Sequence, residues 1–261
     1  MKNYFILLFV ICFCFFSVFA QENKDSDSSW NRQNLKIIKE FIGNIKDQNM
    51  EEICNRISFP FERKYPLPDI KSKEEFLKRY HEVFDDSLIN MIVHSNPESD
   101  WGAVGWRGIM FLRGELWLDY EEGGLISVNY QSKFEIKRRA ELIEAEKKDL
   151  YPTIRNFKEP ILLLETDKYR IRIDDLGKWN YRYVSWPIKE SMREKPEMVL
   201  EKGKLEFVGS GGDHYFEFRN GDYLYECSFS LVGPDEIPPA TLTIKKRGKV
   251  ILNQNAKIIR N

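Results

Sequence analysis

The densest group of residues that could bind a ligand or take part in a reaction is the glycine-rich run GSGG at residues 209–212, followed by Asp213-His214. A loop that holds a phosphate lies between a strand and a helix, so that backbone amides and the helix dipole face the anion. Here the alternating segment 214–219 follows, and then Asn220-Gly221, a pair typical of type I′ hairpin turns. We therefore interpret the run as a turn between two strands.

The three histidines, His81, His94 and His214, do not form a metal-binding pattern. A zinc site needs several converging His, Cys or acidic ligands, often as an i, i+4 pair or a Cys-x-x-Cys pair. No His-Glu-x-x-His and no Gly-x-Ser-x-Gly motif occurs. The sequence therefore predicts no metal site and no cofactor. If the protein is an enzyme, Asp119 and His81 are the candidates for acid/base catalysis.

Two groups of aromatic and arginine side chains are candidates for ligand binding. They are Trp106, Arg107 and Trp117 in one region, and Arg170, Arg172 and Arg182 beside Trp179 in another. Aromatic rings beside cations suit a small molecule, an acidic ligand or a glycan. The competing interpretation is that the tryptophans fill a core and that the arginines are solvated and protect sheet edges.

Residues 1–20 have one Lys before an apolar run that ends in Val18-Phe19-Ala20, which is typical of a secretory signal peptide. This segment predicts an exported protein, periplasmic or secreted, without a stable membrane span after cleavage. An uncleaved N-terminal anchor is the alternative. Cys54 and Cys227 would be the cysteines of the mature chain, and whether they pair stays open.

The elements that must position these residues divide the mature chain into two regions. Residues 21–29 are polar and predict a flexible leader. Over residues 30–132, helical spacing is followed by short alternating runs with Gly-containing turns, which predicts an α+β domain. Residues 133–158 alternate acids and bases, and we interpret them as a charged helical linker. Strict alternation over residues 159–261 predicts an all-β domain, a small sandwich or open barrel.

The order of elements in residues 31–130, ending in VGWRGIMFLRGELWLDY and LISVNY, resembles the NTF2-like (cystatin-related α+β cone) superfamily. That resemblance implies a helix-plus-antiparallel-sheet domain with a cone, in which some members use Asp and His for catalysis and others only bind ligands. The whole mature chain, including YRYVSW and GSGGDHYFEFRNGDYLYEC, also resembles a group of exported bacterial proteins.

These patterns favour an exported, non-catalytic protein that binds a small molecule, a glycan or a protein partner. The formal net charge of −1 at pH 7 leaves no electrostatic footprint for nucleic acid. One alternative is an enzyme with acid/base chemistry in the cone, and another is a structural envelope protein.

Overall fold

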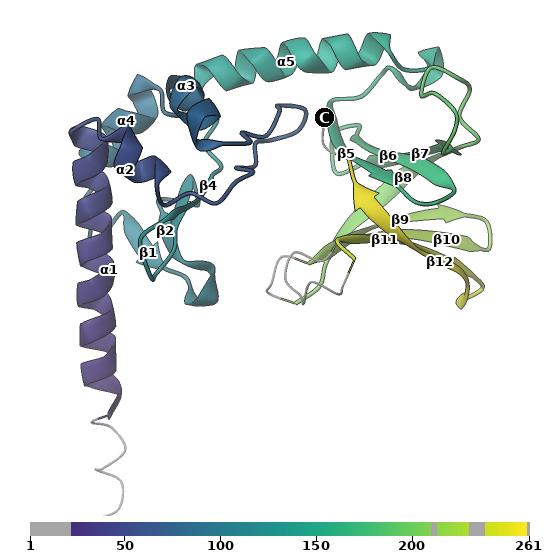
Figure 1. Cartoon of the computed structure of the whole chain (residues 1–261). Helices are drawn as coiled ribbons and strands as arrows, with labels where there is room; N and C mark the ends of the chain where they lie inside the picture. The colour runs from purple at the N-terminus through teal and green to yellow at the C-terminus, as the bar shows by residue number, and fades with distance from the viewer. Residues whose placement is uncertain (1–21, 210–212, 230–237, 260–261) are drawn as a thin grey trace, which may run out of the picture. The chain divides into compact units, whose positions relative to one another are not determined.

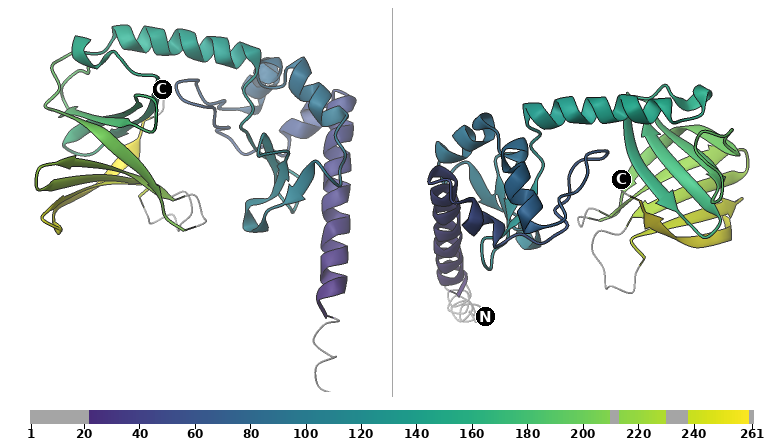
Figure 2. Two further views of the ribbon diagram at one scale, coloured as in Figure 1. Left: turned by 180° about the vertical axis from the view of Figure 1, so that it is seen from behind. Right: turned by 45° about the horizontal axis from the view of Figure 1, so that its top comes forward.

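The structure, a computed structural model, describes residues 22–209, 213–229 and 238–259. The chain forms two compact units (Figures 1 and 2). The first is Met1–Phe59 with Lys73–Tyr130, and the second is Pro60–Ser72 with Gln131–Asn261. The expected signal peptide and residues 210–212 of the glycine-rich run lie outside the described residues. Each helix in the described part of the chain is too short or too polar to cross a membrane.

The first unit consists of helices and one small antiparallel sheet. The helices are α1 (Glu22–Lys46), α2 (Met50–Cys54), α3 (Lys73–Val83) and α4 (Asp86–Val93), and the strands are β1 (Trp101–Ala103), β2 (Ile109–Phe111), β3 (Leu116–Leu118) and β4 (Leu125–Val128), with a 3₁₀ turn η1 (Gly105–Arg107). The strands lie in chain order in the sheet. α1 begins at Glu22, so regular helix replaces the flexible leader that the polar composition predicts.

Local capping starts two of these helices. The Asn49 side chain accepts a hydrogen bond from the backbone N–H of Glu52 at the start of α2, and Asp85 accepts one from Leu88 at the start of α4. Each cap gives a partner to an amide that the first helical turn leaves unpaired. The short polar residues in this part of the sequence therefore determine where the helices begin.

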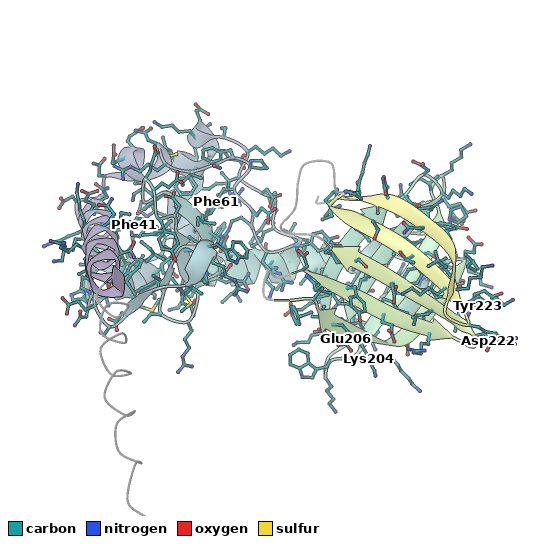
Figure 3. The ribbon with its side chains drawn as sticks, turned by 90° about the horizontal axis from the view of Figure 1, so that it is seen from below. Phe41, Phe61, Lys204, Glu206, Asp222 and Tyr223 are labelled. Carbon is teal, nitrogen blue, oxygen red and sulfur yellow. The ribbon has the colours of Figure 1, made fainter. Side chains whose placement is uncertain are left out.

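One face of the small sheet forms the core with the helices. Ile109, Phe111, Leu116 and Leu118 alternate onto this face and are fully buried. Phe41 of α1, labelled in Figure 3, packs edge-on against Trp101 with ring centroids 6.0 Å apart. Period-two burial in the strands and three-to-four spacing in the helices produce this two-layer core.

The second unit is built on a closed antiparallel barrel of eight strands (Figures 1 and 2). They are β5 (Glu159–Glu165), β6 (Tyr169–Asp175), β7 (Tyr181–Pro187), β8 (Met198–Phe207), β9 (His214–Asn220), β10 (Tyr223–Phe229), β11 (Ala240–Lys246) and β12 (Lys249–Ile258). Each strand pairs with the next, and β12 closes the barrel on β5 at Lys257↔Glu165 and Ile258↔Leu164.

Side chains fill the interior of the barrel, as expected for eight strands. The buried cluster includes Ile171, Tyr183, Phe216, Phe218, Cys227 and Leu242. This close packing requires a glycine at position 203 of β8, because a Cβ there would lie 2.1 Å from the ring of Phe218. Cys54 in the first unit and Cys227 in the barrel are both free and buried, which answers the question of pairing for this structure.

The expected fold class, an NTF2-like domain followed by a sandwich or open barrel, is wrong. The first unit has a small sheet with strands of three or four residues, and the second is a closed barrel. Alternation with period two is the same in a sandwich and in a barrel. Only the pairing of the first strand with the last distinguishes the two, and that contact joins residues about ninety positions apart, which no local pattern reports.

Helix α5 (Lys133–Lys148) belongs to the second unit and packs against the outside of the barrel. Ile143 of the helix joins Leu150, Phe157, Val184 and Trp186 in a separate buried cluster. Its N-cap is Ser132, whose hydroxyl accepts a hydrogen bond from the backbone N–H of Glu135 at 3.1 Å. The charged segment 133–158 thus differs from a solvated linker, since part of its charge is buried.

Ion pairs account for that burial. Glu135 of α5 accepts two hydrogen bonds from the guanidinium of Arg63, at 2.7 and 2.6 Å, and both side chains are almost fully buried. Arg139, one turn further along α5, pairs with Glu159 of β5 at 3.1 Å. A row of alternating charges on a helix predicts exposure only when no opposite charges from other elements meet it.

Candidate functional site

A hollow of about 390 Å³ lies among the helices of the first unit, which gather at the C-terminal end of α1 (Figure 1). Its apolar wall consists of Ile45, Met50, Ile89 and Val93. Its polar groups are Lys46, Gln48, Tyr80, His81, Asp86, Asn90 and His94. Apolar walls with a few converging polar groups, at this volume, are typical of small-molecule sites.

The turn between α1 and α2 forms one side of this hollow. Gln48 adopts a left-handed backbone conformation, with φ of 54°, and the amide of Asn49 bonds the carbonyl of Asn44 at 2.8 Å. This sharp reversal brings Gln48 and Met50 beside the last turn of α1. The end of α3 and the exposed side of α4 supply the remaining residues.

Tyr80 is the most buried polar residue of the hollow, with 2% of its surface exposed. Its ring stacks on Phe84 at 4.9 Å, and the His81 ring meets it edge-on at 5.2 Å. The hydroxyl oxygen is buried and has no hydrogen-bond partner among the described residues. Burial raises the pKa of Tyr80 to about 12, so the hydroxyl stays protonated and remains a hydrogen-bond donor at neutral pH.

His81 and His94, which the sequence leaves unconnected, both line this hollow. His94 is the C-terminal cap of α4, and its Nδ1 lies 2.9 Å from the carbonyl oxygen of Asn90. A carbonyl can only accept, so Nδ1 donates and Nε2 is left as the acceptor in the neutral ring. Within the described ranges no group of three or more His, Cys, Asp or Glu could hold a metal ion.

Asp119, the other candidate for acid/base catalysis, has a structural position. Its Oδ1 accepts hydrogen bonds from the backbone N–H groups of Glu121, Glu122 and Gly123 at 2.8–3.1 Å. The carboxylate therefore closes the connection between β3 and β4. Asp119 does not line the hollow that contains His81, so the structure does not bring these two residues together there.

The arginine candidates of the barrel are divided by the structure. Arg172 and Arg182 are buried, with exposed fractions of 0% and 3%, and both pair with Asp174 at 2.6 Å. Alternation places them correctly on the outer face of β6 and β7, but Phe157 and Glu146 cover that face. A ligand-binding role for Arg172 and Arg182 on an open surface is therefore wrong.

Arg170 and Trp179 remain near the surface of the second unit. Arg170 is half-buried and pairs with Glu165 at 2.8 Å, while its Nη1 donates to the carbonyl of Glu190. Trp179 is 83% exposed in the turn between β6 and β7. The sequence grouped Trp179 with Arg172 and Arg182, but in the structure Trp179 is exposed while both arginines are buried.

Trp106, Arg107 and Trp117 belong to the small sheet of the first unit. Trp106 and Arg107 are exposed in η1, and the Arg107 guanidinium lies 5.9 Å from the Trp106 ring centroid. Trp117 is half-buried on β3, beside Met110 of β2. Trp117 alternates away from the buried side chains of β3, and none of these three residues lines the hollow among the helices.

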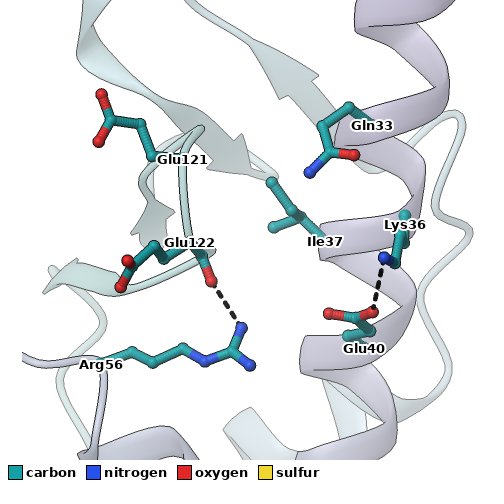
Figure 4. A pocket seen from close by; sticks show the side chains of 7 residues that line it. All are labelled: Gln33, Lys36, Ile37, Glu40, Arg56, Glu121 and Glu122. Atoms are coloured by element: carbon teal, nitrogen blue, oxygen red, sulfur yellow. Dashed lines mark hydrogen bonds and ion pairs between the residues drawn. The ribbon is translucent and has the colours of Figure 1, made fainter.

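A second hollow in the first unit is strongly charged (Figure 4). It measures about 300 Å³ and is lined by Gln33, Lys36, Ile37, Glu40, Arg56, Glu121 and Glu122. Its cations are already engaged, because Lys36 pairs with Glu40 at 3.8 Å and Arg56 donates to the carbonyl oxygen of Glu122 at 2.6 Å. Because both cations already have partners within the chain, a ligand would gain little from them.

The sequence contained a partial signal for Tyr80. Phe76, Tyr80 and Phe84 recur at intervals of four, which places the polar-tipped ring on the buried face of the helix. A buried tyrosine hydroxyl needs a partner or a function. The placement of His81 and His94 at one hollow had no such signal, since it depends on how α3 and α4 pack.

Comparison with known proteins found no matching family model, no matching curated protein and no matching solved structure. The resemblance to the NTF2-like superfamily therefore stays a prediction.

Proposed function

We propose that this chain is an exported binding protein, and that the hollow lined by Tyr80, His81 and His94 takes a small, largely apolar molecule with a carbonyl or carboxylate oxygen. The N-terminal sequence supports export. The observation that carries the site is the convergence of an apolar wall, two imidazoles and Tyr80, whose buried hydroxyl has no partner among the described residues, on one hollow of ligand size.

The chemistry of the ligand follows from the groups around the hollow. Ile45, Met50, Ile89 and Val93 offer apolar contact to a hydrocarbon body. A buried hydroxyl without a partner costs about 1–3 kcal/mol, and a ligand oxygen that accepts from Tyr80 recovers part of it. Reaching this hydroxyl requires a small movement of the side chains that bury it.

The charge of the hollow argues against a highly charged ligand. Lys46 and Asp86 are of opposite sign, and both are exposed at its edge. Asn90 and Gln48 add neutral hydrogen-bonding groups, and the two imidazoles add further ring nitrogens that can form hydrogen bonds. A neutral molecule or a monoanion fits this balance better than a polyphosphate or a polyamine.

A ligand-observed NMR screen of the full chain tests the proposal. The probe is a fragment library of small aromatic and aliphatic acids, amides and alcohols, measured by saturation transfer. We expect binders among molecules that combine an apolar body with a carbonyl oxygen. Val93→Trp fills the hollow and should abolish their signals, while Tyr80→Phe should weaken acceptor-bearing binders about fivefold to tenfold, the loss of one hydrogen bond.

The matched control is Asp222→Asn, which changes an exposed residue of the barrel unit. Its binding should equal that of the parent. A library without binders, or binders that Val93→Trp does not affect, contradicts the proposed site. Unchanged burial of Cys54 in each variant, measured by thiol labelling, excludes unfolding as the cause.

A further inference from the structure

The small sheet of the first unit carries apolar side chains that the other described residues of this unit leave exposed. Among the described residues of this unit, three large apolar side chains are exposed: Trp106 at 63%, Ile126 at 49% and Leu112 at 39%. All three come from the sheet β1–β4 or its connections. Clustered apolar exposure of this kind marks an interaction surface more often than scattered single residues do.

The strand register shows which side chains of β2, β3 and β4 are neighbours. Met110 of β2 and Trp117 of β3 are directly paired, and Trp117 is paired with Ser127 of β4. Ile126 is the extra residue where the register of β4 shifts, and its Cδ1 would lie 3.1 Å from a Cβ at Gly108. We define the tryptophan face as Trp106, Arg107, Met110, Trp117 and Ile126.

The turn at one end of the tryptophan face carries an independent sign of function. Leu112 has φ of 51°, a left-handed conformation that a bulky residue rarely adopts, and its side chain is partly exposed. Glycine or asparagine at this position would remove the strain. Strained, exposed apolar residues are found where a surface is used.

The composition of this region is that of a protein–protein interface. Residues 101–118 contain Trp, Met and Arg, a single acid, Glu115, and no lysine. Aromatic residues, Met and Arg are enriched at such interfaces, whereas Lys, Glu and Asp are depleted. Trp and Arg are also enriched among the interface residues whose replacement by alanine costs the most binding free energy.

The charges of this face indicate that its partner is negatively charged. Arg107 and Arg113 are exposed and form no ion pair within the part of the chain that the structure describes. The Arg107 guanidinium lies 5.9 Å from the Trp106 ring centroid, within the range of a cation–π contact. A second copy placed on the same face would bring these arginines together, which is unfavourable.

We propose that the tryptophan face docks a polypeptide segment of a partner protein in which apolar side chains are flanked by Asp or Glu. The apolar side chains cover Met110, Trp117 and Ile126. The carboxylates pair with Arg107 and Arg113, where the planar guanidinium suits two-point contact. This interaction is separate from the hollow among the helices and does not depend on it.

A peptide selection tests the docking surface. A phage-displayed library of random peptides is selected on the full chain, and synthetic copies of the selected peptides are titrated by fluorescence polarisation. We expect sequences that join an aromatic or long aliphatic residue to Asp or Glu. Trp106→Ala and Arg107→Glu should each weaken binding about tenfold or more.

Two controls separate docking from misfolding. Trp179→Ala removes an even more exposed tryptophan of the other unit and should leave the affinity unchanged. Peptides with Lys in place of their acids should bind the Arg107→Glu variant better than they bind the parent. That charge-reversal rescue has no explanation if the substitution merely disturbs the sheet.

Several outcomes would overturn the proposal. They are a selection without enriched peptides, an affinity that Trp106→Ala does not lower, and a failure of the charge-reversal rescue. Self-association that Trp106→Ala removes in sedimentation experiments would assign the face to a second copy instead. Flotation with phosphatidylglycerol vesicles that depends on Trp106 would assign it to a membrane surface.

Discussion

Replacing Asp174 with asparagine should destabilise the barrel unit strongly. Asp174 Oδ1 accepts a hydrogen bond from Arg172 Nε, and Oδ2 accepts one from Arg182 Nη2, both at 2.6 Å. Asp174 and Arg172 are completely buried. Asparagine keeps the size of the side chain but removes its charge, so two buried guanidinium groups lose an anion that they share.

The expected loss can be estimated from the cost of breaking a buried pair. Removing one partner of such a pair costs about 3–5 kcal/mol, because the remaining charge stays out of water. Glu146 still pairs with Arg172, so we place the loss near the lower end, about 3 kcal/mol. With an m-value of about 2 kcal/mol/M, the urea midpoint falls by about 1.5 M.

The two buried thiols provide an assay for each unit. Cys54 lies in the first unit and Cys227 in the barrel, and both are free. Burial raises the pKa of Cys227 to about 12, so a maleimide reacts with it only after the barrel opens. Labelling at increasing urea, resolved by peptide mass spectrometry, then reports the unfolding of each unit separately.

Asp174→Asn should shift the midpoint of Cys227 labelling and leave that of Cys54 unchanged. The matched control is Asp222→Asn, which removes an exposed partner of Arg247 and should change stability by less than about 0.5 kcal/mol. If Asp174→Asn behaves like the control, the buried ion pairs do not stabilise the barrel unit, and the reasoning is refuted.

Three further substitutions test other parts of the structure. Asp119→Ala leaves three turn amides without their acceptor and should cost about 2 kcal/mol in the first unit, seen as a lower midpoint for Cys54 labelling. Equal urea midpoints for Cys54 labelling in Asp119→Ala and in the parent would contradict the structural role of Asp119. Trp179→Gly removes a bulky residue from a left-handed position with φ of 60° and should raise the stability of the barrel by up to about 1 kcal/mol in urea denaturation; a clear loss would show that the indole makes stabilising contacts. Burial raises the pKa of Glu159, but Arg139 and Lys64 outweigh it and lower the pKa overall. The pair therefore stabilises the folded state above the unfolded pKa of about 4.3 and loses this effect as the pH falls through the lower folded pKa. Glu159→Gln should lower the thermal midpoint at pH 7 and have little effect at the acid end, and a loss that persists undiminished there would contradict the assignment.

Local patterns predicted several elements because the contacts that stabilise them lie close in sequence. Asn220-Gly221 predicts a hairpin, and β9 and β10 pair across it, with Tyr223 opposite Asn220 and Gly221 at φ of 56°. The strands on both sides of the GSGG run are also present and antiparallel, as Phe207 pairs with His214. Helical spacing also predicts a helix from residue 133, although the helix ends at Lys148 and does not extend to residue 158.

Long-range contacts decided the rest. The closure of β12 on β5, the burial of Arg172 and Arg182 beneath α5 and residues 149–157, and the placement of His81 and His94 at one hollow each join residues far apart in the sequence. By itself, the sequence determined where the chain forms strands, turns and helices, because these preferences act over a few residues. Which faces became core, which charges became paired and which side chains converged depended on how the elements pack together. Burial and charge pairing are properties of that packing, so only the tertiary structure decided them.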